Sequence, residues 1–98
     1  KLADALKQLE REIPQDIAWV LRVDGHTDTD PMQNAEFKSN WELSSARAIS
    51  VVNYLEAQGV QSKHLVAAGF GQHQPLVAGD TEEAKSENRR IELKLTER

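Results

Sequence analysis

The segment from Ile17 to Asp24 constrains the fold more than any other part of the chain, because most of it is apolar. In an extended strand, large apolar side chains would share one face: Ile17, Trp19, Leu21 and Val23. The opposite face would carry Ala18, Val20 and Arg22. A strand that is apolar on both faces suits the centre of a covered sheet. We therefore expect a central strand that Gly25 ends.

Amphipathic helices flank this strand. Before it, apolar residues recur at helical spacing, and Pro14 then ends the pattern: Leu2, Ala5, Leu6, Leu9 and Ile13. After it, residues 39–42 read Ser-Asn-Trp-Glu, a capping box that predicts a helix from there to about Gln58, with Gly59 as its stop. The predicted core face of that helix carries Ala48, Val51, Val52 and Leu55.

Two further strands and a short helix complete the pattern. A short apolar strand is expected at 65–70, a helix from Asp80 or Thr81 to near Asn88, and a half-buried strand with Ile91, Leu93 and Leu95 on its apolar face. The alternation of helices and strands predicts an α/β (α+β sandwich) fold, with helices packed on a small β-sheet. We expect residues 1–98 to form a single domain.

The composition excludes several classes of function. The net charge of −4 argues against a nucleic-acid partner, which would require a basic face. Without cysteine, the chain forms no disulfide, zinc–cysteine site or thiol nucleophile. No run of 18 apolar residues is present, so none of its segments should span a membrane. We expect no cofactor.

Two chemical alternatives are weaker. Asp24, His26, Asp28 and Asp30 alternate in one segment, and carboxylates and imidazoles bind metals, but no further histidine has ligand spacing, so we expect no metal. Ser44 or Ser45 with His26 as base would suggest a hydrolase. No nucleophile-elbow motif supports it, so we do not expect an enzyme.

A long polar loop, residues 26–39, leads into the second helix and contains Asp28. Together with Arg47 in the helix, Asp28 could form an ion pair that ties the loop down, or the two could grip a ligand carrying an ammonium and a carboxylate. Spacing alone leaves both interpretations open. Likewise, Arg89 and Arg90 are either turn residues that pair with acids of the preceding short helix or a second cationic wall for an anionic ligand.

Five motifs, in order from about Val20 to Leu95, resemble the OmpA-like peptidoglycan-binding domain family. They are Gly25-His26-Thr27-Asp28, Asn40-x-x-Leu43-Ser44-x-x-Arg47-Ala48, Tyr54-Leu55 with Gly59-Val60, Gly69-Phe70-Gly71 with Pro75, and Asn88-Arg89-Arg90-Ile91-Glu92. The segment 39–44 and the long loop with Asp30-Pro31 are most similar to the flagellar stator (MotB-like) branch.

The resemblance implies a β-α-β-α-β-α-β fold with a mixed sheet and helices on one face, here without its first strand. It implies non-covalent binding of peptidoglycan through the diaminopimelate of its stem peptide. The matching ligand-binding residues are Thr27, Asp28, Asn40, Leu43, Ser44, Arg47 and Arg89. Among them, Asp28 and Arg47 would grip the diaminopimelate, and Arg89 would line the pocket.

The implied setting is the periplasm, where the chain would be a fragment of a membrane-anchored envelope or stator protein. A homodimer is compatible with that setting. The alternative function is a scaffold or dimerisation domain of an envelope complex, with a vestigial pocket.

Overall fold

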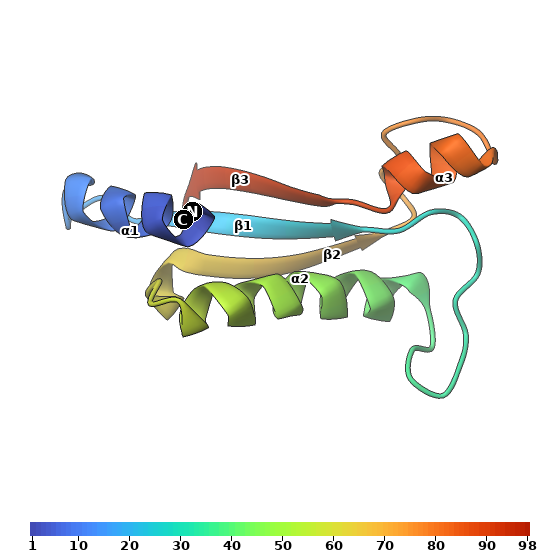
Figure 1. The fold of residues 1–98 in the computed structure, drawn as a ribbon, viewed down its shortest axis with the longest axis horizontal. Helices are drawn as coiled ribbons and strands as arrows, with labels where there is room; N and C mark the ends of the chain where they lie inside the picture. The colour runs from blue at the N-terminus through green and yellow to red at the C-terminus, as the bar shows by residue number, and fades with distance from the viewer.

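The computed structural model describes residues 1–98 and confirms the predicted order of helices and strands. The elements are α1 (Leu2–Glu12), β1 (Trp19–His26), α2 (Asn40–Ala57), the 3₁₀ turn η1 (Ser62–His64), β2 (Leu65–Gly71), α3 (Glu82–Asn88) and β3 (Ile91–Glu97). The three strands form one sheet in the order β2-β1-β3 (Figure 1). Strand β1 is therefore central, as its two apolar faces predict.

The sheet is mixed, because β1 runs parallel to β2 and antiparallel to β3. Helices α1 and α2 cover one of its faces and enclose a core of seven buried side chains: Ala3, Leu6, Leu21, Val23, Ala48, Leu55 and Val60. This is the expected α+β arrangement, with three strands and without the first strand of the implied order. None of the helices has both the length and the apolar composition that a bilayer span requires.

The predicted capping box starts α2. The Ser39 hydroxyl accepts a hydrogen bond from the Glu42 backbone N–H at 3.4 Å. The Glu42 carboxylate reaches back and accepts from the Lys38 N–H at 3.1 Å. The first bond satisfies one N–H group that an uncapped helix start would leave unpaired, and the second holds the residue before the cap, so together they fix where α2 begins.

The prediction that Gly25 ends the first strand is wrong. Gly25 pairs with Gly69 of β2 and Ile91 of β3, and β1 continues to His26. The glycine is needed for packing, because a Cβ atom at this position would lie 2.1 Å from the carbonyl oxygen of Ser44 in α2. Glycine inside a strand often marks such a close approach of two backbones.

The apolar face of β3 is more exposed than its alternating pattern predicts. Leu93 and Leu95 are 41% and 52% exposed. They pair with Val23 and Leu21, so they lie on the sheet face that carries the helices. However, α2 packs across β2 and β1, which leaves the edge strand β3 outside its cover.

We expect Gly25→Ala to destabilise the fold strongly. The added methyl group would force α2 away from β1, and overpacking of this kind costs up to about 3 kcal/mol. For a domain of this size that corresponds to a melting temperature lower by about 15 °C, measurable by circular dichroism.

The matched control is Ser50→Ala on the exposed side of α2, which should change the unfolding free energy by less than about 0.5 kcal/mol. A melting temperature for Gly25→Ala equal to that of the control would contradict this account of the glycine.

Candidate ligand site

Four segments meet at one end of the sheet: the ends of β1 and β2, the start of α2 and the start of β3 (Figure 1). Backbone hydrogen bonds join them. The Thr27 N–H donates to the Gly71 carbonyl at 2.9 Å, and the His26 N–H donates to the Arg90 carbonyl at 3.0 Å. The fully buried Ser44 hydroxyl accepts from the Gly71 N–H at 2.9 Å, which ties α2 to the same place.

Asn40 holds the loop after β1 against the start of α2. Its buried side-chain amide donates to the backbone carbonyls of Asp28 and Asp30, at 3.4 and 3.0 Å, and to the Gln72 side chain at 2.8 Å. The first residues of the long loop are therefore fixed at the sheet end. The rest of the loop projects away from the sheet before it returns to α2 (Figure 1).

Asp28 pairs with Arg89, and the interpretation of an Asp28–Arg47 ion pair is wrong. The Arg89 Nη1 donates to the Asp28 Oδ2 at 2.7 Å, and the backbone N–H of Asp30 donates to the other oxygen at 3.0 Å. Asp28 is only 8% exposed, so its carboxylate is both buried and oriented. The two partners are 61 positions apart in sequence, so spacing along the chain did not suggest the pair.

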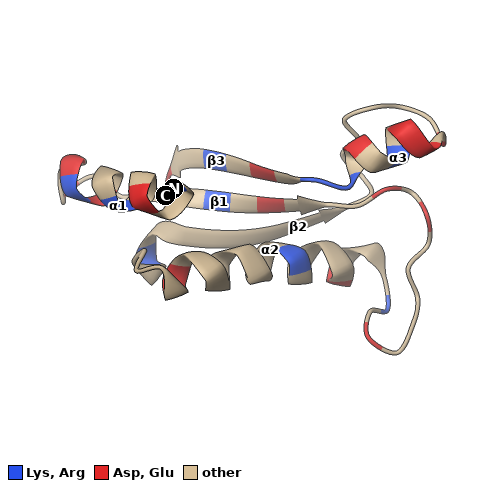
Figure 2. Ribbon diagram, viewed as in Figure 1, with Lys and Arg blue, Asp and Glu red and all other residues tan.

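The two arginines before β3 are also not turn residues that pair with acids of α3. Arg89 takes Asp28 as its partner, and the Arg90 Nε donates to Glu92 at 2.5 Å. Figure 2 shows acidic and basic segments meeting at this end of the sheet, on the β1–α2 and α3–β3 connections. The neighbouring Lys85 of α3 pairs with Asp30 at 3.0 Å and adds a second tie to the loop.

Arg47 is half-buried and takes part in none of the ion pairs. Its direction follows from its neighbours: Ser45 faces Gly69 of β2, and Ser44 faces Gly25 of β1. Because a helix turns by about 100° per residue, Arg47 lies on the flank of α2 that points away from β2, toward the β3 side. Helical side chains lean toward the N-terminus, so Arg47 leans toward Asn40.

The structure thus brings together five of the seven predicted ligand-binding residues at the sheet end: Thr27, Asp28, Asn40, Ser44 and Arg89. The other two, Leu43 and Arg47, occupy the adjoining flank of α2 and are half-buried. Neither makes a side-chain hydrogen bond to the first five.

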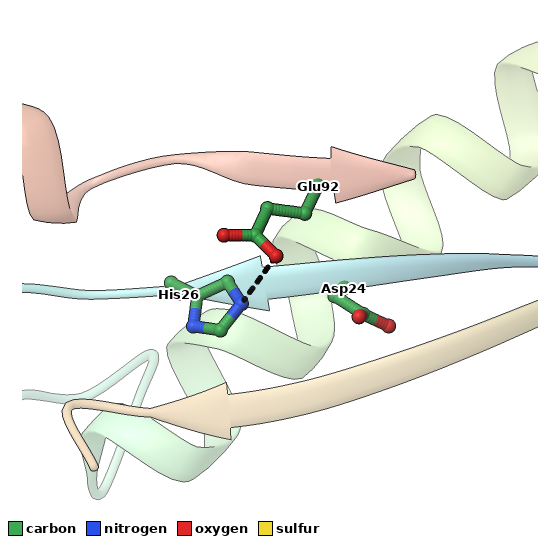
Figure 3. A group of neighbouring side chains, drawn as sticks. All are labelled: Asp24, His26 and Glu92. Atoms are coloured by element: carbon green, nitrogen blue, oxygen red, sulfur yellow. Dashed lines mark ion pairs between the residues drawn. The ribbon is translucent and has the colours of Figure 1, made fainter. Parts of the chain in front are cut away.

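On the other face of the sheet lies a polar cluster that the sequence analysis did not assemble (Figure 3). Ligand-type atoms of Asp24, His26 and Glu92 lie within 4.8 Å of one another. Along the sequence, Asp24 and His26 alternate with Asp28 and Asp30. In the structure Asp28 pairs with Arg89 and Asp30 pairs with Lys85, so neither belongs to this cluster. The strand register explains the difference, because Asp24 pairs with Glu92 across β1 and β3.

Both carboxylates of this cluster are neutralised. Arg22 donates to Asp24 with two nitrogens, at 2.7 and 2.9 Å, and Arg90 holds Glu92. Two acids and two guanidiniums leave no net charge to attract a cation. The cluster is also separated from α2, because Ser44 packs on the opposite sheet face, so the serine–histidine pair of the hydrolase alternative does not form.

His26 is the unusual member of the cluster. It is 4% exposed, neither ring nitrogen has a hydrogen-bond partner, and its ring stacks on Phe70 with centroids 5.0 Å apart. Burial lowers the pKa of His26 below its ordinary value, and the nearby Arg90 lowers it further, while Glu92 opposes the shift. His26 is therefore held as a neutral ring at neutral pH.

A profile of the OmpA family matches residues 1–89. The chain belongs to the OmpA family. The match covers every predicted site residue, from Thr27 to Arg89, which places the sheet end described above within the family's domain.

Named relatives of the chain agree with that assignment. Motility protein B of Bacillus subtilis (strain 168) is 39% identical over 77 residues, 78% of this chain and 30% of the relative. The peptidoglycan-associated lipoprotein of Pseudomonas aeruginosa is 35% identical over 72 residues, 74% of this chain and 40% of the relative. The chain thus spans well under half the length of both proteins, and neither name denotes an enzyme.

The fold also has a solved counterpart. The crystal structure of the periplasmic domain of Helicobacter pylori MotB matches with a TM-score of 0.79 and 26% identity, over 98% of this chain and 60% of that one. The likeness to the MotB branch therefore holds in sequence and in structure.

The pKa of His26 predicts how stability depends on pH. The unfolded chain has an ordinary histidine pKa of about 6.5, so it binds a proton that the folded chain resists. The contribution of His26 to the free energy of unfolding is then constant above about pH 6.5. It falls as the pH drops through that value toward the lower pKa of the folded state. We expect the urea midpoint to be lower at pH 5 than at pH 7.

Replacing His26 by Phe keeps a ring against Phe70 and removes the titrating group. The decrease in the urea midpoint that His26 causes between pH 7 and pH 5 should then disappear. Replacing the exposed His73 by Phe is the matched control and should leave the fall intact. Equal pH dependence in all three proteins would show that His26 does not cause it.

Proposed function

We propose that this chain binds peptidoglycan non-covalently through the diaminopimelate of its stem peptide. The observation that carries the proposal is the arrangement of charge at the sheet end. There, the Asp28 carboxylate is buried and oriented, and the adjoining flank of α2 carries Arg47, which forms no ion pair within the protein. Membership of the OmpA family and the name of the peptidoglycan-associated lipoprotein among its relatives support peptidoglycan as the ligand.

Asp28 is suited to receive the ligand's ammonium. Each oxygen of a carboxylate accepts more than one hydrogen bond, and Asp28 currently receives one from Arg89 and one from the Asp30 backbone. Both donors fix the orientation of the carboxylate, so little conformational entropy is lost when the ammonium binds.

Arg47 is the proposed partner of the ligand's carboxylate. Its planar guanidinium can form two parallel hydrogen bonds to a carboxylate, which is more specific than a point charge. Its side chain leans toward the N-terminus of α2, where the helix dipole favours a negative group. Asn40 and Ser44 would act as positioning residues, since their side chains tie α2 to the loop and to β2.

The larger protein would use this domain as a cell-wall anchor. The short coverage of the relatives leaves room for the membrane-anchored part of an envelope or flagellar-stator protein. We place the domain in the periplasm by analogy with the named periplasmic domain of Helicobacter pylori MotB. Residues 1–98 would then form the single wall-binding domain of that protein.

One observation favours a second candidate, a scaffold or dimerisation domain. The edge strand β3 carries the exposed Leu93 and Leu95, and an exposed apolar edge strand readily pairs with another chain. A homodimer through β3 would leave the sheet end free, so the two functions are compatible in one protein.

The proposal predicts a preference between two stem tripeptides that differ only at the third residue. Lysine keeps the terminal ammonium of diaminopimelate and lacks its carboxylate. By isothermal titration calorimetry we expect the diaminopimelate peptide to bind about 10- to 100-fold more tightly, the value of one charge-assisted contact. Arg47→Ala should abolish the preference, and Asp28→Asn should weaken both peptides.

Arg11→Ala, on the exposed side of α1, is the control and should bind like the wild type. Equal affinity of the wild type for the two peptides, or a preference that persists in Arg47→Ala, would refute the assignment of Arg47. A wild type that binds neither peptide and does not sediment with sacculi would refute peptidoglycan binding itself.

A further inference from the structure

We propose that Trp41 and the groove beside it bind a sugar of the glycan strand, at the start of α2 and on the flank opposite Arg47. This inference rests on the proposed function and extends it from the peptide to the polysaccharide. The occupant is one N-acetylated hexosamine unit, stacked on the exposed indole ring of Trp41.

Trp41 is exposed and yet oriented. It is 54% exposed, whereas the other tryptophan, Trp19, is 5% exposed. Its ring stacks on His73, with centroids 4.8 Å apart and the planes 29° from parallel. A Cβ atom at Gly71 would lie 3.5 Å from the Trp41 ring, which is ordinary van der Waals contact, so the indole packs against the end of β2.

This positioning gives Trp41 the character of a binding platform. An aromatic side chain held in place by neighbours loses little entropy when a ligand packs on it. A large apolar ring exposed on a folded surface is also informative, because tryptophan is mostly buried in proteins. The faces of a pyranose ring carry C–H groups, which pack well on the electron-rich face of an indole.

The groove next to Trp41 has the composition that a neutral sugar needs. It is a shallow, open groove of about 410 Å³, and its apolar lining includes Phe37, Trp41 and the exposed Ile49. The charged residues of its lining are Glu36 and Glu42. Carboxylates only accept hydrogen bonds, so they match the hydroxyl and acetamido donors of an N-acetylhexosamine and repel phosphate or carboxylate ligands.

The location of the groove selects a sugar over a basic peptide, which would also suit the two acids. Trp41 follows Asn40 directly in α2, and the Asn40 side chain donates to the backbone of Asp28 in the proposed stem-peptide site. In peptidoglycan the stem peptide is attached to the glycan, and diaminopimelate is its third residue. Three ordinary extended residues span about 10 Å, and the γ-glutamyl link and the diaminopimelate side chain lengthen the stem further, so a bound stem lets its sugar reach around the start of α2.

That tethering makes even a weak sugar contact effective. Two linked binding events give the second partner an effective concentration in the millimolar range. The groove then needs only modest intrinsic affinity for the sugar to increase retention on intact peptidoglycan. The groove would also make binding depend on the glycan as well as on the peptide.

The test uses three ligands with the whole 98-residue chain. They are chitotetraose as a peptide-free glycan, the diaminopimelate tripeptide as a sugar-free stem, and intact sacculi. The two indole N–H signals in ¹H–¹⁵N NMR spectra report separately on Trp41 and Trp19. We expect chitotetraose to shift the Trp41 signal saturably and to leave the buried Trp19 signal unchanged.

Variants then separate the sugar contact from the peptide contact. Trp41→Ala should lose about tenfold or more in chitotetraose affinity and in retention on sacculi, with tripeptide affinity unchanged within about twofold. Trp41→Phe should restore part of the sugar binding. Tyr54→Ala is the matched control, an aromatic on the same helix that is 58% exposed, and should behave like the wild type.

Three results would overturn the sugar site: no saturable effect of chitotetraose on a wild type that binds the tripeptide, unchanged sugar affinity in Trp41→Ala, or a Trp41 signal that responds to oligolysine and not to chitotetraose. Each of these leaves the stem-peptide proposal standing. Failure of the tripeptide arm refutes the stem-peptide proposal instead, so the two failures are distinguishable.

Discussion

The close approach of α2 to the sheet at Ser44 is the constraint on which the rest of the structure depends. The Ser44 hydroxyl is fully buried, donates to the Trp41 carbonyl at 3.1 Å and accepts from the Gly71 N–H at 2.9 Å. The helix can come this near only because Gly25 carries no side chain where the Ser44 carbonyl lies. One serine and one glycine thus set the height of α2 above β1 and the level at which it begins.

That constraint converts a helix terminus into part of a binding site. Because α2 is fixed, the Asn40 side chain reaches the loop after β1 and donates to the backbone carbonyls of Asp28 and Asp30. Arg89 arrives from the α3–β3 connection and orients the Asp28 carboxylate. The charged groups of the proposed site therefore come from two connections that are distant in sequence and from α2, and the two connections are held by hydrogen bonds.

The helices and strands could be predicted well from the sequence, whereas the ion-pair partners could not, and both outcomes have physical reasons. Periodicity and capping depend on local spacing, so the central strand and the start of α2 at Asn40 could be predicted. Ion-pair partners depend on tertiary distance, and Asp28 took Arg89 across 61 positions of sequence. Gly25 was misinterpreted because a breaker signal and a packing requirement look identical along the chain.

The candidate site shows the same division. The family motifs identified its residues, yet the residue spacing could not show that Arg47 stays free of a protein carboxylate. Nor could it show that His26 lies buried beside Glu92, because that contact depends on the antiparallel register of β1 and β3. The role of Trp41 was hidden for another reason: its position in the capping segment gives no indication of whether its ring is covered.

The central claim is that the sheet end holds a zwitterionic amino acid between Asp28 and Arg47. The most direct measurement is a solution NMR structure of the chain bound to the diaminopimelate tripeptide. The account predicts intermolecular contacts that place the ligand's free ammonium at the Asp28 carboxylate and its carboxylate at the Arg47 guanidinium. Contacts from the diaminopimelate to the β3 edge at Leu93 and Leu95, with none to Arg47, would contradict it.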